Sequence, residues 1–70
     1  MNKYYFTFGC GIDNLHRHCY HVIEAEDREK ARKTMFDRFG AKWAFQYDSA
    51  EAAGVSKWNL TEINELGEPL

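Results

Sequence analysis

Three histidines and one cysteine fall within six residues, HRHCYH at positions 16–21, and Cys10 lies a short distance upstream. Imidazole nitrogens and thiolate sulfurs are the ligands that zinc prefers, and a cysteine beside a histidine can also act as a nucleophile. A zinc site needs about four ligands that converge as a tetrahedron. The spacing C-x5-H-x-H-C-x-H is not that of a zinc finger or ribbon, so the residue types are right but the pattern is unusual.

Strand geometry divides these candidate ligands. If residues 16–21 are extended, His16 and His18 point to one face, and Cys19 and His21 point to the other. Only two of the four side chains then meet, with Cys10 as a candidate third. We therefore expect no metal site, and we interpret Cys19 as a small apolar packing residue at the start of a strand. A small zinc-binding module is kept as an alternative.

Catalysis by a Cys–His pair is not expected either. A chain of 70 residues leaves little volume for a pocket of the hundreds of Å3 that substrates usually occupy. The sequence contains no nucleophile elbow and no glycine loop long enough to bind phosphate. We predict that the protein is not an enzyme and uses no cofactor.

The elements that position these residues follow from periodicity and from start and stop signals. The run from Arg28 to Phe39 has apolar residues at helical spacing, an N-cap at Asp27 and a glycine stop at Gly40. A short helical turn capped by Asp48 is expected later. Alternating runs predict strands at residues 3–9, 18–25, 42–47 and 58–63. The predicted fold class is α+β: a two-layer sandwich with one main helix packed on a small, mainly antiparallel sheet, in the order β-β-α-β-turn-β.

Apolar side chains indicate which faces of these elements are covered. On the helix, the side chains predicted to face the sheet are Ala31, Met35, Phe36 and Phe39. In the third strand, the side chains predicted to share one face are Trp43, Phe45 and Tyr47. The first strand has aromatic residues at both even and odd positions, so its second face is expected to be a binding surface.

Composition indicates one packed domain over residues 1–70. The chain is 44% hydrophobic and 16% aromatic, which supplies a dense core and argues against disorder. Residues 64–70 are expected to form a flexible tail, because Gly67 and Pro69 interrupt regular structure. No signal-like start and no apolar run near the ~20 residues of a membrane span is present. We therefore expect a cytoplasmic protein whose cysteines stay reduced.

Charge is unevenly distributed although the net formal charge is only −2. Residues 48–70 carry five acids against one base, and residues 1–47 are net positive. Such an acidic surface can compete with DNA for a basic groove, while tyrosine supplies typical interface anchors. The residues expected to contact a partner are Glu24, Glu26, Asp27, Asp48, Glu51, Glu62 and Glu65, with Tyr5, Tyr20 and Tyr47 as aromatic anchors.

The helix begins with a basic stretch, REKARK at 28–33, which has four bases in six residues. Such a patch would suit nucleic acid if it were combined with exposed aromatic residues. Four acids lie beside it, however, and the bases occupy more than one side of the helix. A solvated helix face with alternating charge explains the stretch more simply, so direct nucleic-acid binding is not expected.

The stretches VIEAEDREKARKTMFDRFGAKWAFQY and SAEAAGVSKWNLTEI resemble a group of small orphan proteins carried by phages and prophages. That group shares a KYYFTFG-like opening, an IEAED-x-x-x-AR-x-x-MF-x-RFG helix and a KWAFQY strand. The resemblance covers the chain from Lys3 to about Ile63, and the Cys/His cluster lies outside the shared pattern. Some small phage proteins, including certain anti-CRISPR proteins, inhibit host defence complexes by protein–protein contact. The resemblance implies such a role by analogy, with no inhibitory motif carried over residue by residue.

We therefore expect a small non-enzymatic protein that binds and inhibits or modulates a host protein complex, with an anti-CRISPR protein that mimics DNA as the concrete version. The expected partner is a host protein, such as a nucleic-acid-binding defence complex, and no membrane is involved. The chain itself is expected to be a monomer or a homodimer. The alternative is a small zinc- or nucleic-acid-binding module.

Overall fold

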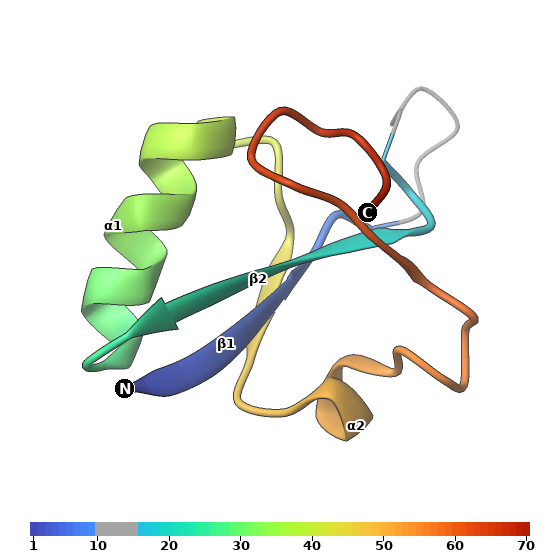
Figure 1. Ribbon diagram of the computed structural model, residues 1–70, viewed down its shortest axis with the longest axis horizontal. Coiled ribbons are helices and arrows are strands. Elements are labelled where there is room, and N and C mark those ends of the chain that lie inside the picture. The colour runs from blue at the N-terminus through green and yellow to red at the C-terminus, as the bar shows by residue number, and fades with distance from the viewer. Residues whose placement is uncertain (10–15) are drawn as a thin grey trace.

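A four-stranded sheet with one long helix against it forms the body of the protein (Figure 1). The computed structural model describes residues 1–9 and 16–70, so the predictions for Cys10 lie outside the described residues. The elements in chain order are β1 (Asn2–Thr7), β2 (Cys19–Ala25), α1 (Arg28–Phe39), β3 (Phe45–Tyr47), α2 (Ala50–Ala53) and β4 (Thr61–Glu62). The predicted α+β class is confirmed.

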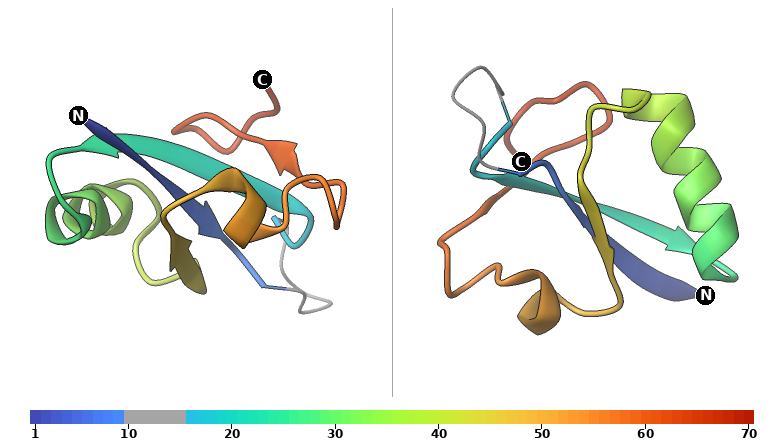
Figure 2. Two further views of the ribbon diagram at one scale, coloured as in Figure 1. Left: turned by 90° about the horizontal axis from the view of Figure 1, so that it is seen from below. Right: turned by 180° about the vertical axis from the view of Figure 1, so that it is seen from behind.

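The strands lie in the order β3-β1-β2-β4. β1 is antiparallel to both of its neighbours, and β4 is parallel to β2, which confirms a mainly antiparallel sheet under one main helix. The chain leaves β3 at one edge and returns as β4 at the other edge. On the way it passes through α2, which packs against β1 and β3 on the face opposite α1 (Figure 2).

The core lies on the face of the sheet that α1 covers. Tyr4, Phe6 and Phe8 alternate along the first strand segment, and all three are buried against the helix residues Ala31 and Met35. Phe6 and Met35 are completely buried. Removing a side chain of this size from water stabilises the fold by about 1.5–3 kcal/mol. A few such aromatic residues therefore supply much of the stability of a short chain.

The bounds of α1 follow from its two end signals, as the sequence predicts. The Asp27 carboxylate accepts a hydrogen bond from the Lys30 amide at 2.9 Å and so satisfies one of the free N–H groups of the first turn. At the other end, the Gly40 amide donates to the Phe36 carbonyl at 2.8 Å. Gly40 has a φ of +63°, which a residue with a side chain rarely adopts.

Two predicted side-chain orientations are wrong. Phe36 does not face the sheet as Ala31 and Met35 do, because its side chain is 46% exposed. Trp43 does not share a face with Phe45, because β3 begins only at Phe45 and strand alternation does not extend back to Trp43. The Trp43 ring instead turns to the α1 side, where it packs edge-on against Phe6 with centroids 5.2 Å apart.

The connection from β3 to β4 is set by two local contacts. Ser49, and not Asp48 as predicted, is the N-cap of α2, since its hydroxyl accepts a hydrogen bond from the Ala52 amide at 3.0 Å. Gly54 ends α2 at a φ of +77°, and a Cβ at this position would collide with the ring of Trp58. The turn that begins at Gly54 continues through Asn59, whose φ is +52°, so the predicted strand at 58–63 is reduced to β4.

The C-terminal residues fold back along the outer side of β4. The Leu70 amide donates to the Glu62 carbonyl at 3.0 Å, and Ile63 forms an antiparallel bridge with Pro69. The side chain of Asn64 closes the loop between them by accepting two backbone hydrogen bonds. The predicted flexibility of residues 64–70 concerns motion and stays a prediction. In this arrangement the outer edge of β4 is covered by the chain itself.

His21 joins β2 to this C-terminal segment and to α1. It is buried, its Nδ1 lies 2.7 Å from the Ile63 carbonyl oxygen, and its Nε2 lies 2.9 Å from Nη1 of Arg38. Because a guanidinium can only donate, Nε2 must accept and Nδ1 must carry the proton. Nη2 of Arg38 lies 3.7 Å from the Glu65 carboxylate. The contacts therefore require a neutral imidazole.

The core assignment predicts a large effect for Phe6→Ala. Deleting this completely buried ring should lower the free energy of unfolding by about 3–5 kcal/mol, because transfer and cavity costs add. Phe45→Ala, at a side chain that is 58% exposed, is the matched control and should change it by less than about 1 kcal/mol. Urea denaturation of both variants measures the difference, and equal losses would contradict the assignment.

The buried His21 predicts that stability depends on pH. Burial lowers the pKa of His21, and the Arg38 guanidinium also lowers it, against the opposing effects of the Ile63 carbonyl and of Glu62 and Glu65. The unfolded chain has an ordinary histidine pKa of about 6.5. Stability from neutral His21 is therefore complete above about pH 6.5 and is lost as the pH falls through the lower folded pKa.

Urea denaturation at pH values between about 7 and 5 checks this dependence. The free energy of unfolding should fall with pH in the parent chain and vary less in His21→Gln. His18→Gln, at an exposed histidine of the same cluster, should keep the parent's dependence. A parent chain whose stability is constant over this range would show that His21 titrates equally in both states.

Candidate functional site

The acids predicted to contact a partner lie in three segments of the structure. In the strand register, Glu24 lies opposite Lys3 near one end of β2, and Glu62 lies opposite Tyr20 near the other end. These two carboxylates therefore do not meet. The end of β2 and the turn into α1 hold Glu24, Glu26 and Asp27. The region of β3 and α2 holds Asp48 and Glu51, and the C-terminal region holds Glu62 and Glu65.

Several of these acids already have partners within the chain. Glu26 contacts Nζ of Lys30 at 2.7 Å, Asp48 contacts Nε of Arg28 at 3.9 Å, and Glu65 contacts Arg38. Asp27 caps α1, and Glu62 accepts a long hydrogen bond from the Tyr20 hydroxyl at 3.4 Å. Exposed pairs of this kind add little stability, but they offset the negative charge that a partner would meet.

The three predicted tyrosine anchors do come together, on the face of the sheet opposite α1. Tyr47 lies directly across from Tyr5 in the β1–β3 pair, and the rings of Tyr5 and Tyr20 are 6.3 Å apart. All three are half-buried. Burial raises the pKa of the Tyr20 hydroxyl, and the nearby Glu62 carboxylate adds to the effect, so Tyr20 remains a neutral donor.

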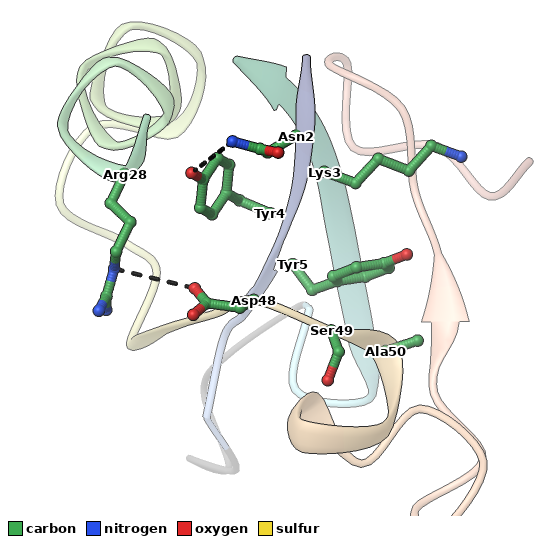
Figure 3. A pocket seen from close by; sticks show the side chains of 8 residues that line it. All are labelled: Asn2, Lys3, Tyr4, Tyr5, Arg28, Asp48, Ser49 and Ala50. Atoms are coloured by element: carbon green, nitrogen blue, oxygen red, sulfur yellow. Dashed lines mark hydrogen bonds and ion pairs between the residues drawn. The ribbon is translucent and has the colours of Figure 1, made fainter. Parts of the chain in front are cut away.

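A hollow of about 500 Å3 lies beside this row, where β1 extends beyond the end of β3. Figure 3 shows Tyr4 and Tyr5 pointing to opposite sides of β1, Tyr4 toward α1 and Tyr5 toward α2. The ion pair between Arg28 and Asp48 spans the hollow. Because Arg28 and Asp48 offset one another, the remaining charge among the lining residues of this hollow is that of Lys3.

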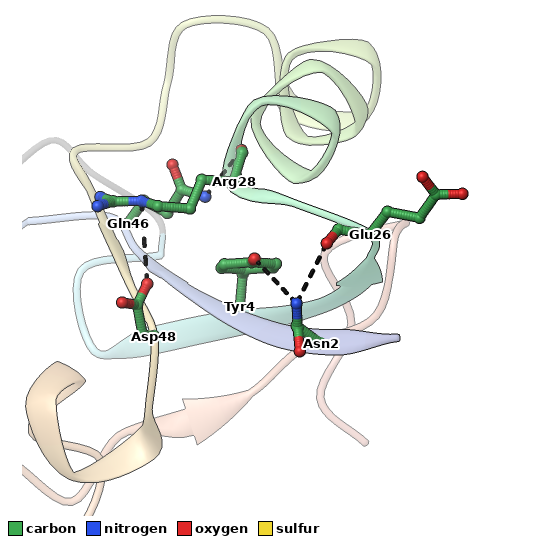
Figure 4. Close-up of polar contacts among 6 residues, drawn as sticks. All are labelled: Asn2, Tyr4, Glu26, Arg28, Gln46 and Asp48. Atoms are coloured by element: carbon green, nitrogen blue, oxygen red, sulfur yellow. Dashed lines mark hydrogen bonds and ion pairs between the residues drawn. The ribbon is translucent and has the colours of Figure 1, made fainter.

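Backbone contacts fix the walls of this region (Figure 4). The Gln46 side-chain amide donates to the Arg28 carbonyl at 3.0 Å and so ties β3 to the first turn of α1. The Asn2 amide donates to the Glu26 carbonyl at 3.1 Å, which ties β1 to the turn before α1. These two hydrogen bonds to the backbone therefore set the position of the start of α1 relative to β1 and β3.

A second hollow, of about 340 Å3, runs between α1 and the edge strand β3. We call it the β3 groove. Figures 1 and 2 show β3 and the residues before it running alongside α1 in the opposite direction. The groove is lined by Arg28, Arg32 and Phe36 from α1 and by Ala41, Trp43, Ala44, Phe45 and Gln46 from the facing segment.

One row of the helix and one aromatic ring organise the β3 groove. Arg28, Arg32 and Phe36 are four residues apart and therefore lie in line along α1. The Arg32 guanidinium lies over the Trp43 ring, 5.4 Å from its centroid, and the Phe36 ring packs edge-on to Trp43 at 5.3 Å. Trp43 thus holds the middle and the end of the row in place. Phe36 and Phe45 remain about half exposed on the two sides of the groove.

The β3 groove is positively charged, in contrast to the chain as a whole. Two arginines line it and none of its lining residues is acidic. Within residues 1–9 and 16–70, Arg32 forms no ion pair, and Arg28 has only its long contact with Asp48. A guanidinium stacked on an aromatic ring keeps its N–H edge free for a carboxylate or phosphate. The groove can therefore bind an anionic, partly apolar ligand.

The arginines of the β3 groove were not among the residues expected at a contact surface. The sequence signal was present, because REKARK continues into Phe36 and places two of its four bases in line with an aromatic residue. The interpretation of the stretch as a solvated face with bases on several sides of the helix did not identify the row of Arg28, Arg32 and Phe36. Phe45 was identified only as a strand residue, since nothing in a single sequence marks β3 as an edge strand.

The Cys/His cluster does not assemble as a site among the described residues. The structure groups no three His, Cys, Asp or Glu side chains in a way that could hold a metal ion in residues 1–9 and 16–70. His16 packs against the rings of Phe8 and Phe39, which also contact each other, and His21 has the contacts described above. Cys19 is half-buried next to the core, and burial raises the pKa of its thiol, which disfavours a thiolate. Among the described members of the cluster, His16, Cys19 and His21 therefore have contacts within the fold, and His18 is exposed.

Comparisons of the chain with protein-family models, with curated proteins and with solved structures found no match. Among the described residues, no helix has the length and apolar character needed to cross a membrane.

Proposed function

We propose that this chain is a non-enzymatic protein that binds another protein and thereby inhibits or modulates a defence complex in the host cytoplasm, in the manner of an anti-CRISPR protein. The contact is made through the β3 groove. The inhibitory role is drawn from the sequence resemblance to small phage proteins. The place of contact is drawn from the geometry of the groove.

The observation that carries the proposal is the combination of exposed aromatic rings with positive charge at the β3 groove, where Arg32 has no ion-pair partner among residues 1–9 and 16–70. Phe45 and Phe36 are 58% and 46% exposed, and the Arg32 guanidinium lies over the Trp43 ring, 5.4 Å from its centroid. Aromatic residues and arginine are the types enriched at protein interfaces and at their energetic hot spots. Exposed rings of this size favour a surface that is covered in a complex.

The groove is a better basis for the proposal than mimicry of DNA. A DNA mimic needs spaced carboxylates whose charge is free to meet a basic groove. Glu26, Asp48 and Glu65 each contact a base within the chain. A contact through the groove also uses the aromatic side chains, whose removal from water supplies most of the binding energy at such surfaces.

A phage plaque assay tests the function. The chain is produced in a panel of bacterial strains whose CRISPR–Cas systems each target a test phage, and restored plaque formation reports inhibition. Truncating a hot-spot aromatic costs about 2 kcal/mol or more of binding energy, so Phe45→Ala should lose most of the restoration. Arg32→Glu should do the same, because it reverses the charge of the groove.

Two matched variants control this assay. Lys33→Glu makes the same charge change one residue further along α1, outside the groove, and should keep the restoration. The double variant Glu51→Lys/Glu62→Lys should also keep it, whereas a DNA mimic would lose it. No restoration by the parent chain in any strain would contradict the inhibitory role. Restoration that survives both groove variants would place the contact elsewhere.

A further inference from the structure

We propose that the β3 groove binds an extended acidic segment of the partner protein, which adds to the outer edge of β3 as a fifth strand. This inference rests on the proposed function and names the chemistry of the partner. The segment carries carboxylates at two alternate positions, facing Arg28 and Arg32, and an apolar side chain at the next alternate position, facing Phe36.

The two edges of the sheet differ in whether the chain covers them, and this difference indicates β3 as the edge to which a strand can add. The edge of β4 is covered by the C-terminal residues through the Leu70 to Glu62 hydrogen bond and the Ile63–Pro69 bridge. Among the described residues, no strand pairs with the outer side of β3. An uncovered edge presents backbone N–H and C=O groups that another chain can use.

β3 itself has few of the features that prevent strand addition. Such features include charged side chains and proline on the edge strand, and Phe45–Tyr47 has neither. β3 is only three residues long, so backbone hydrogen bonds alone give a weak complex. Side chains beside the strand must supply the remaining affinity and the specificity.

The spacing of the α1 row matches the spacing of an added strand. Residues four apart on a helix are about 6 Å apart along its axis, and alternate residues of a strand are about 6.7 Å apart. β3 runs alongside α1 (Figures 1 and 2), so a strand added to β3 runs along the same row. Its side chains on the α1 side therefore meet Arg28, Arg32 and Phe36 in succession. Its other side chains lie beside Phe45 and Tyr47.

The positive charge of the β3 groove favours an acidic partner segment. The groove contributes two guanidinium groups and no carboxylate, and the cation–π contact of Arg32 with Trp43 leaves its N–H groups able to form a bidentate pair. Single-stranded nucleic acid could also use arginines and aromatic rings, but a chain of net charge −2 repels it at longer range. A peptide carries only local charge and gains the backbone pairing that nucleic acid cannot make.

Synthetic peptides test the inference with the complete chain. The probe peptide has glutamates at two alternate positions and isoleucine at the next, and it is made in both sequence directions. One comparison peptide has glutamine in place of glutamate, and another has N-methyl groups on alternate residues to block backbone pairing. A fluorescent oligo-thymidine is the nucleic-acid probe. Fluorescence anisotropy measures binding, and light scattering measures self-association.

The inference predicts binding of the glutamate peptide in one direction. Either comparison change in the peptide should weaken binding at least about tenfold. Arg32→Glu should weaken it to a similar extent, whereas Lys33→Glu should change it less than about twofold. Equal binding of the glutamine or N-methyl peptides would overturn the inference, as would preferential binding of oligo-thymidine, or a homodimer that Phe45→Ala dissociates.

The plaque assay separates failure of this inference from failure of the proposed function. If the groove variants lose plaque restoration and none of the peptides binds, the function stands and the added strand is rejected. If the groove variants keep restoration, the groove is not the inhibitory contact, whatever the peptides do.

Discussion

The structure depends on a difference between the two edges of its short sheet, of which the C-terminal residues cover one. At one edge, His21 donates from Nδ1 to the Ile63 carbonyl, and Leu70 folds back to pair with Glu62, so β4 and the residues after it close the sheet. The hydrogen bond from His21 requires a neutral, buried imidazole, which links this closure to pH. At the other edge, β3 is three residues long and pairs with β1 alone among the described strands. One edge is sealed by the chain and the other remains available.

The properties of the β3 groove follow from that difference. α1 packs over β1 and β2, so the side of β3 is left to Trp43, which reaches back to Phe6 and Phe36. The same ring supports Arg32, and the Gln46 side chain holds β3 against the first turn of α1. The groove is therefore built on groups fixed by the core and by backbone hydrogen bonds. Contacts that already hold Trp43 and Gln46 reduce the ordering that binding a partner requires.

The sequence predicts the fold better than it predicts the site. The bounds of α1 can be read from Asp27 and Gly40, because capping is a local interaction, and alternation identifies β1 and β2. Trp43 and Phe36 were assigned to the wrong faces, because the start of β3 and its position at an edge depend on tertiary pairing. The distribution of the predicted acids over three segments also depends on strand order, which a single sequence does not reveal. The spacing of Arg28, Arg32 and Phe36 places them in one row on the helix, and this can be seen in the sequence. Their role in a groove becomes visible only when the structure places β3 beside them.

The central claim is that the partner segment pairs with the backbone of β3. Hydrogen–deuterium exchange measures it most directly, because a peptide that adds as a strand protects outward-facing amides that are open in the free chain. The account predicts slower exchange at Phe45–Tyr47 when the glutamate peptide is bound, with little change at β4, whose edge is already covered. Binding that leaves the exchange of the β3 amides unchanged would contradict it.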